Sequence, residues 1–224
     1  GKVYGGALYN KGTANITGHF VNNAAQSENH VSGFGGAIFN DGDLTLAENT
    51  TFYANRADNA GGALYNSGSI AELKGARFQN NYSANGGAIN NANLRDLGQG
   101  TIGSISDSYF YGNIASDGGA IRNQGVITSI TDTVFEYNQG GNGGALWDGT
   151  LGQIDAVATT ENGAFINYTA LSGPERLGCA ISQPGRFAVH DGVLCDAIQA
   201  ADNAGALAPR QSTDAYTLWT EPSQ

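Results

Sequence analysis

Two cysteines in the last quarter of the chain could carry covalent chemistry. Cys179 and Cys195 lie 16 positions apart, on either side of the stretch AISQPGRFAVHDGVL. A catalytic thiol needs a nearby base, and His190 is the only candidate in this region. In an oxidising compartment the same two sulfurs would instead form a disulfide. These residues alone leave both interpretations open.

Carboxylates are the second source of chemistry. An enzyme that cleaves polysaccharides needs an acid and a base on the two sides of one sugar linkage. Asp41 and Asp43 are close in sequence, and Asp107 and Asp132 are 25 residues apart, but no histidine or arginine recurs in phase with them. Acidic residues also favour turns for purely local reasons. We therefore expect solvated turn carboxylates, with no catalysis and no cofactor or metal.

The segments that would position any site recur along the sequence as a repeat. A hexapeptide of GGA, a leucine or isoleucine, a variable residue and an asparagine or aspartate begins at residues 5, 35, 61, 86, 118 and 143. Successive copies therefore start 30, 26, 25, 32 and 25 residues apart. Every later copy follows a phenylalanine that has an asparagine three residues after it. Two signals in phase indicate a structural unit of about 25 residues.

Strands suit this unit better than helices. A Gly-Gly pair in each unit would cost a helix roughly 2 kcal/mol, and apolar residues show no helical period. Residues 71–78, 101–110 and 126–135 instead alternate apolar and polar side chains, as strands do. A unit with two or three short strands closes one coil of a parallel β-helix, whose coils stack about 4.8 Å apart. The sequence thus predicts an all-β solenoid of about six coils.

The invariant positions of the repeat predict its interior. Strand alternation places the leucine or isoleucine of the hexapeptide on one face and the variable residue on the other. We expect two buried ladders and, beside them, asparagines that stack their amides and occupy left-handed turn positions. The aliphatic ladder is Leu8, Ile38, Leu64, Ile89, Ile121 and Leu146. The aromatic ladder is Phe20, Phe52, Phe78, Phe110 and Phe135.

The variable position of the hexapeptide is the best candidate for binding. It predicts a candidate binding strip of Tyr9, Phe39, Tyr65, Arg122 and Trp147, with Asn90 in the remaining copy. Aromatic rings at coil spacing on an outer face would suit sugar rings or a protein partner. Alternatively, an overlying loop covers the strip, or the rings only strengthen the sheet through side-chain ladders.

The paired motifs resemble those of a known family. GGA[LI]xN and FxxN at this period are similar to the repeats of the chlamydial polymorphic outer membrane proteins and of related autotransporter passenger domains. The resemblance covers residues 5–168. It implies a right-handed parallel β-helix that is exported to the outer cell surface, with adhesion as the commonest role in the group.

The remaining part of the chain differs from the repeats. Residues 169–224 contain all four prolines and both cysteines, so we divide the chain into a repeat domain, 1–168, and a C-terminal cap or coupling segment, 169–224. The export that the resemblance implies favours a disulfide between Cys179 and Cys195 over a catalytic thiol.

Composition limits the partners. With 20 acidic and 10 basic residues, the formal net charge is −10, which argues against nucleic acid and anionic lipid. No apolar run of about 20 residues is present, so we expect no membrane insertion by this chain. The expected function is a secreted or cell-surface adhesin or structural subunit without catalysis. The alternative is a polysaccharide-binding module or a polysaccharide-degrading β-helix enzyme.

Self-association is a further expectation. The first hexapeptide begins at residue 5, so the first coil would present unpaired backbone groups unless something covers it. Either an identical molecule pairs with it end to end and forms a filament, or upstream coils or a cap precede it. A glycan or a host or neighbour surface protein is the other expected partner.

Overall fold

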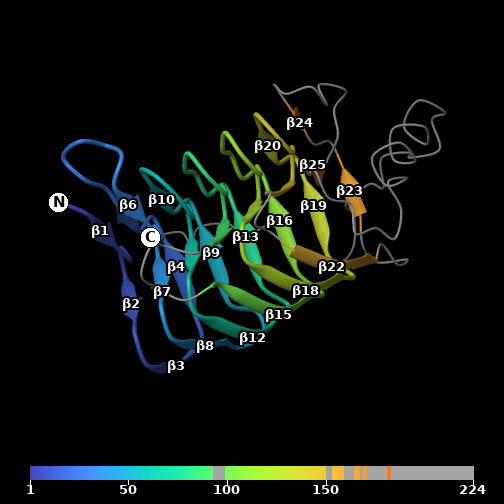
Figure 1. Ribbon diagram of the computed structural model, residues 1–224, viewed down its shortest axis with the longest axis horizontal. Helices are drawn as coiled ribbons and strands as arrows, with labels where there is room; N and C mark the ends of the chain where they lie inside the picture. Colours follow the sequence, from blue (N-terminus) through green and yellow to red (C-terminus); the bar gives the residue numbers. More distant parts are fainter. Residues whose placement is uncertain (93–98, 150–152, 159–163, 167–168, 171–180, 183–224) are drawn as a thin grey trace, which may run out of the picture.

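The computed structural model is an elongated stack of parallel β-strands (Figure 1). It describes residues 1–92, 99–149, 153–158, 164–166, 169–170 and 181–182, with side chains for 1–92 and 99–149. Among these residues there are strands, bridges and turns but no helix. About four turns of the solenoid are described completely.

Three parallel sheets run the length of the stack, and each coil contributes one strand to each sheet. The hexapeptide sheet contains β2 (Leu8–Asn10), β7 (Ile38–Asn40), β11 (Leu64–Asn66), β14 (Ile89–Asn91), β17 (Ile121–Asn123), β21 (Leu146–Asp148) and β25 (Ile181–Ser182). The long-strand sheet contains β3 (Thr13–Ile16), β8 (Asp43–Leu46), β12 (Ser69–Lys74), β15 (Thr101–Ser106), β18 (Val126–Thr131) and β22 (Gln153–Ala158). The phenylalanine sheet contains β4 (His19–Val21), β9 (Thr51–Tyr53), β13 (Arg77–Gln79), β16 (Tyr109–Tyr111), β19 (Val134–Glu136) and β23 (Ala164–Ile166).

Short pairings complete each coil before the next hexapeptide. They involve β1 (Val3–Tyr4) with β6 (Gly33–Phe34), β5 (Ala24–Ala25) with β10 (Arg56–Ala57), and β20 (Gln139–Gly140) with β24 (Thr169–Ala170). Isolated bridges extend these pairings, with Phe34, Ala60, Asn85, Asp117 and Asn142 forming one row. The first interval between hexapeptides is long because of the extra residues in the loop between β5 and β6. This insertion lies in a loop, so the sheets stay in register.

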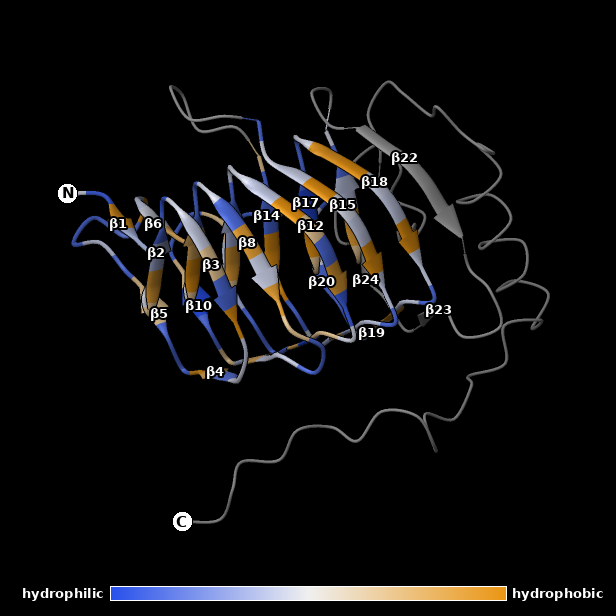
Figure 2. Ribbon diagram, turned by 90° about the horizontal axis from the view of Figure 1, so that it is seen from below, coloured by the Kyte–Doolittle hydropathy of each residue, from blue (hydrophilic) through white to orange (hydrophobic). Residues whose placement is uncertain are grey.

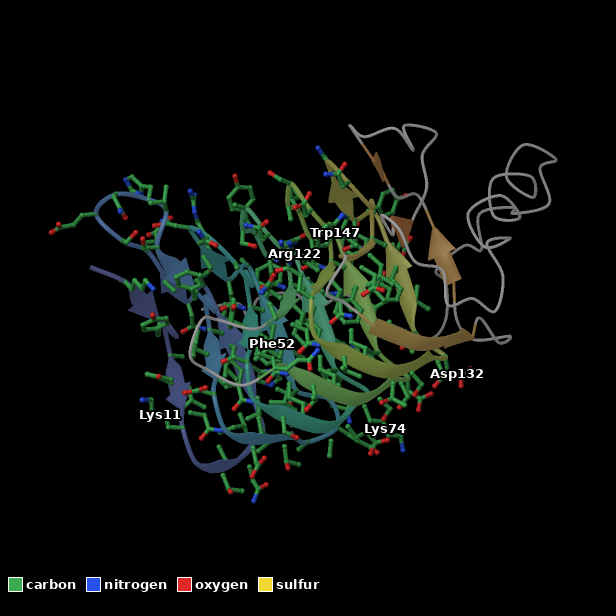
Figure 3. All side chains as sticks on the ribbon, in the orientation of Figure 1. Lys11, Phe52, Lys74, Arg122, Asp132 and Trp147 are labelled. Atoms are coloured by element: carbon green, nitrogen blue, oxygen red, sulfur yellow. The ribbon has the colours of Figure 1, made fainter. Side chains whose placement is uncertain are left out.

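The inward faces of the three sheets form one hydrophobic core. Figure 2 shows apolar residues at equivalent positions of β12, β15 and β18. The aliphatic ladder is buried from Ile38 to Leu146, and Leu8 packs against it at the first coil. In the aromatic ladder, neighbouring phenylalanine rings stack with centroids 4.6–5.0 Å apart. Figure 3 shows Phe52 in the interior and Lys11, Lys74 and Asp132 on the periphery. Both predicted ladders are confirmed.

Asparagine amides form two further ladders, as predicted. In the hexapeptide sheet, the Nδ2 of each asparagine donates to the Oδ1 of the next coil over 2.7–2.8 Å, from Asn10 to Asp148. The asparagines of the FxxN motif make the same bonds over 2.8–3.0 Å, from Asn23 to Asn138. Asp148 accepts at the last described position, where a carboxylate can accept a hydrogen bond but cannot donate one.

The expected left-handed positions are wrong for these ladder asparagines. The left-handed residue is the one before the FxxN asparagine, whatever its type: Asn22, Ala54, Asn80, Gly112 and Tyr137 have φ between 53° and 61°. None of the ladder asparagines has a positive φ. The turn therefore precedes the amide that it positions.

The glycine pair has two separate causes. The first glycine is left-handed in every copy, for example with φ of 66° at Gly61, which costs glycine little. The second glycine is where coils come closest: a Cβ on Gly62 would lie 2.0 Å from the carbonyl oxygen of Gly87 in the next coil. Only glycine fits this corner without a backbone shift.

The structure thus confirms an all-β parallel β-solenoid. The count of six coils stays a prediction, because the last unit includes residues that the structure does not describe. Cys179, Cys195 and almost all of the predicted segment 169–224 also lie outside the described residues, so the disulfide and the cap remain predictions.

Candidate ligand-binding groove

The predicted binding strip forms one continuous row on the outer face of the hexapeptide sheet. Strand register places the variable residue of each coil directly beside that of the next. The row reads Tyr9, Phe39, Tyr65, Asn90, Arg122 and Trp147. Phe34, Ala60 and Asn85, which precede the glycine pairs of their coils, line one pocket together with Tyr65, Asn90 and Arg122 of the row, and we call the row and these flanking residues the groove. The chain therefore brings all five predicted residues together.

The first half of the row is aromatic and largely covered. Phe39 stacks on Tyr65 with ring centroids 5.0 Å apart. Tyr4 meets Phe39 edge to face at 4.7 Å, and Phe34 meets Tyr65 at 5.5 Å. As a result Phe39 is 0% exposed and Tyr65 3%, whereas Tyr9 is 41% exposed. This half of the strip is thus exposed at Tyr9 and covered at Phe39 and Tyr65, as the alternative of a covered strip expects, and the two covered rings belong to a second apolar cluster.

The second half of the row is polar and centred on Arg122. Its Nη1 donates to Gln124 Oε1 at 2.6 Å and to Asn90 Oδ1 at 3.3 Å. The guanidinium lies over the Trp147 ring, 4.7 Å from the ring centroid, and Figure 3 shows the two side chains next to each other. Nε lies 3.7 Å from Asp117 Oδ2, too far for a hydrogen bond, and donates to no described residue. Arg122 therefore orders its neighbours while keeping unused donors.

A pocket of about 320 Å³ lies where the aromatic and polar halves meet. It is lined by Lys2, Phe34, Asn59, Ala60, Tyr65, Asn85, Asn90, Ala92, Arg122 and Gln124. The described residues that line it include two cations, four side-chain amides and two aromatic rings, and none of these lining residues carries a carboxylate. In a chain with an excess of acidic residues, this is a locally cationic site.

Burial changes the ionisation of two groups at this pocket. Burial raises the pKa of the Tyr65 phenol above its usual range, although the nearby Arg122 opposes the shift. Burial likewise lowers the pKa of Arg122, while Asp117 opposes that change. Arginine stays protonated under any ordinary condition, so the pocket keeps a positive charge and a neutral phenol.

The carboxylates that suggested an enzyme lie elsewhere. Asp107 and Asp132 follow β15 and β18 at left-handed turn positions, with φ of 48° and 47°. Asp41 is in the turn before β8, and Asp43 begins that strand. No group of three or more histidine, cysteine or acidic residues in the described part of the chain could hold a metal ion. None of these four carboxylates lines the pocket, and catalysis is an untested alternative.

Sequence reasoning missed an exposed row at the residue after each FxxN asparagine. Bridges align Arg56, Tyr82, Ile114 and Gln139 in successive coils. Tyr82 is 46% and Ile114 40% exposed, and the Arg56 guanidinium lies 5.0 Å from the Tyr82 ring centroid. The signal was present in the sequence, because the position follows a fixed motif, but its residues vary in type from coil to coil.

The fold and the groove define a parallel β-solenoid whose coils carry the same two motifs. Residues 49–67 and 107–124 match the family model of the Chlamydia polymorphic membrane protein repeat. Each matched segment contains one FxxN motif and the hexapeptide after it. The chain is therefore a polymorphic membrane protein-like parallel β-helix.

The other comparisons add no relative. Neither the curated proteins nor the solved structures gave a match to the chain. In the part of the chain that the structure describes, no helix is long and apolar enough to cross a membrane.

Proposed function

We propose that the chain is a surface-exposed, autotransporter-like passenger that acts in adhesion without catalysis. The observation that supports this is the repeat match, which falls on the motifs that build the coils. A stack of parallel strands with a buried core holds side chains at fixed spacing along its length, and proteins of this construction use such extended surfaces for binding.

The groove is the surface that we assign to adhesion. It offers an exposed tyrosine at Tyr9 and a pocket with polar groups ready to bind. Interfaces are enriched in aromatic and arginine anchors, and the groove provides both. A polysaccharide-binding module is the second candidate, and the cationic, amide-lined pocket is the observation that favours it.

The test measures adhesion: the purified chain is coupled to beads, and the beads that adhere to host or neighbouring cells are counted. We expect Tyr9→Ala to reduce adhesion several-fold. The matched control is Tyr137→Ala, because Tyr137 is also exposed, at 51%, but follows the phenylalanine sheet. Beads that never adhere would refute the adhesive role, and equal loss in both variants would refute the role of the groove. End-to-end association through coil edges stays a prediction from the sequence.

A further inference from the structure

We infer that the pocket beside Arg122 binds a sugar residue that carries a carboxylate. This inference deepens the proposed function, since it names the ligand class of the same groove. It rests on three observations, namely the charge of the lining, the donors and acceptors of its amides, and the volume of the pocket.

The charge of the lining selects an anion. Lys2 and Arg122 both line the pocket. The only described carboxylate near Arg122 is Asp117, at 3.7 Å, and its other oxygen accepts a hydrogen bond from Asn142 Nδ2 at 2.8 Å. Lys2 forms no ion pair with a described residue, so of the two cations only Arg122 has a carboxylate beside it.

Arg122 also orients donors toward the same point. Because its Nη1 holds Asn90 Oδ1 and Gln124 Oε1, the amide nitrogens of these two residues are left to donate. Neither nitrogen has a hydrogen-bond partner among the described residues, and the same is true of Arg122 Nη2. A carboxylate has only acceptors, so it suits a cluster of N–H donors and would form charge-assisted hydrogen bonds with Arg122.

Two other amides of the lining, those of Asn59 and Asn85, offer acceptors. The Nδ2 of Asn59 donates to the carbonyl of Val31 at 2.7 Å, and the Nδ2 of Asn85 donates to the carbonyl of Asn59 at 3.0 Å. The Oδ1 atoms of both amides are then left to accept. Sugar hydroxyls donate as well as accept, so they match acceptors placed across from donors.

The volume and the polar lining favour a sugar ring over a small anion. Phe34 and Tyr65 line the pocket but are only 9% and 3% exposed, so they close its apolar side and leave little ring face for a sugar to pack on. About 320 Å³ lies at the lower end of the range for small-molecule sites. A bare phosphate would be better served by converging backbone N–H groups, whereas this lining consists of side-chain amides and rings.

The test measures binding of digalacturonate, its neutral counterpart galactobiose, and galactose 6-phosphate to the purified chain by calorimetry or ligand-detected NMR. We expect digalacturonate to bind at least about tenfold more tightly than galactobiose, because hydrogen bonds to charged groups are worth about 1.5–3 kcal/mol. Arg122→Gln should abolish that preference, and Lys2→Gln should reduce it.

The matched control is Arg56→Gln, which removes the same charge from the exposed row outside the pocket. It should leave the preference unchanged. Because Arg122→Gln could disturb the sheet, Asn85→Ala provides a second variant at the rim and should weaken binding of both disaccharides. The thermal transition of each variant shows whether it is folded.

Three results would overturn the inference: equal affinity for the acidic and neutral sugars, an unchanged preference in Arg122→Gln, or tighter binding of galactose 6-phosphate. Bead adhesion measured on the same Arg122→Gln protein keeps the two proposals separate. Lost sugar preference with intact adhesion would support the pocket and detach it from adhesion. Intact sugar preference in a chain that never adheres would refute only the proposed function.

Discussion

The inward aliphatic ladder and the outer row of the hexapeptide sheet are built from the same strands yet differ in how much their residue types vary. At the inward position every coil has leucine or isoleucine, whereas one residue further on the chain runs from aromatic rings to Asn90, Arg122 and Trp147. An inward side chain must fit two identical neighbours inside a closed core. An outer one meets a groove that changes along the stack, so the uniform positions report packing and the varied ones carry chemical information.

The largest effect that would test this contrast is expected in the aromatic ladder. Phe78 is fully buried between two stacked rings, so Phe78→Ala should lower the free energy of unfolding by about 3–5 kcal/mol. Tyr82→Ala, at an exposed ring, is the control and should change it by less than about 1 kcal/mol. Urea denaturation measures both. Similar losses in the two variants would break the contrast.

The asparagine ladder should give the next largest effect. Asn81 donates to Asn113 Oδ1 and to the Phe52 carbonyl, and it accepts from Asn55. Asn81→Ala leaves buried partners unsatisfied and should cost about 2–3 kcal/mol. Asn15→Ala, at an exposed asparagine on β3, should stay within about 0.5 kcal/mol. If Asn81→Ala cost as little as Asn15→Ala, the asparagine ladder would not contribute to stability.

The glycine corner allows a test with a single methyl group. Gly62→Ala would place a Cβ against backbone atoms of the next coil and should cost about 1–3 kcal/mol. At Gly12 an added Cβ meets nothing within 4 Å, so Gly12→Ala should be nearly neutral. Thermal melts of the two variants provide the comparison. A neutral Gly62→Ala would mean that coils can separate at the corner.

The smallest expected effect concerns Tyr65, an outer residue that is buried like an inner one. The unfolded chain releases the phenol proton near pH 10, but burial raises the pKa in the folded state. Above pH 10 the unfolded state therefore binds fewer protons, and stability falls as the pH rises. Tyr65→Phe should reduce that slope by up to about 1.4 kcal/mol per pH unit.

Denaturation at pH 8, 10 and 11 measures this slope. At pH 8 the phenol is protonated in both states, so the variant and the parent should there differ by a constant offset only. Tyr109 also has a raised pKa, caused by burial and by its bond to Glu136, so part of the slope should persist in Tyr65→Phe. An identical slope in both proteins would show that Tyr65 is solvated.

The sequence predicted the coil well because its repeated residues meet copies of themselves. The period, the parallel coils, both hydrophobic ladders and the asparagine stacking follow from alternation and spacing alone, whereas the prediction of two or three strands per coil did not settle the number of sheets. The strip of Tyr9, Phe39 and Tyr65 was placed on the correct face, but its burial depends on Tyr4 and Phe34. Those rings come from residues just before the glycine corner, and only the bend at that corner brings them over the strip.

The pocket could not be predicted for a related reason. Asn59 and Asn85 carry no motif, and they meet Asn90 and Arg122 only because the corner folds one row over another. The left-handed position before the FxxN asparagine could not be predicted either, because Ala54 and Tyr137 occupy it as well as glycine. Backbone closure dictates that conformation, so residue type gives little indication of it.

The register of the stack has a consequence for how such a chain can change over generations. Every strand pairs with the equivalent residues of the coil before and the coil after. Duplication of one whole unit in the gene would therefore create only junctions that the protein already contains, whereas loss of half a unit would misalign every ladder at once. Each new copy could then diverge at its outward-facing residues, such as the variable position of the hexapeptide, while its interior stayed constant. Gene duplication could therefore lengthen this surface, and point substitutions could change its chemistry, in independent steps.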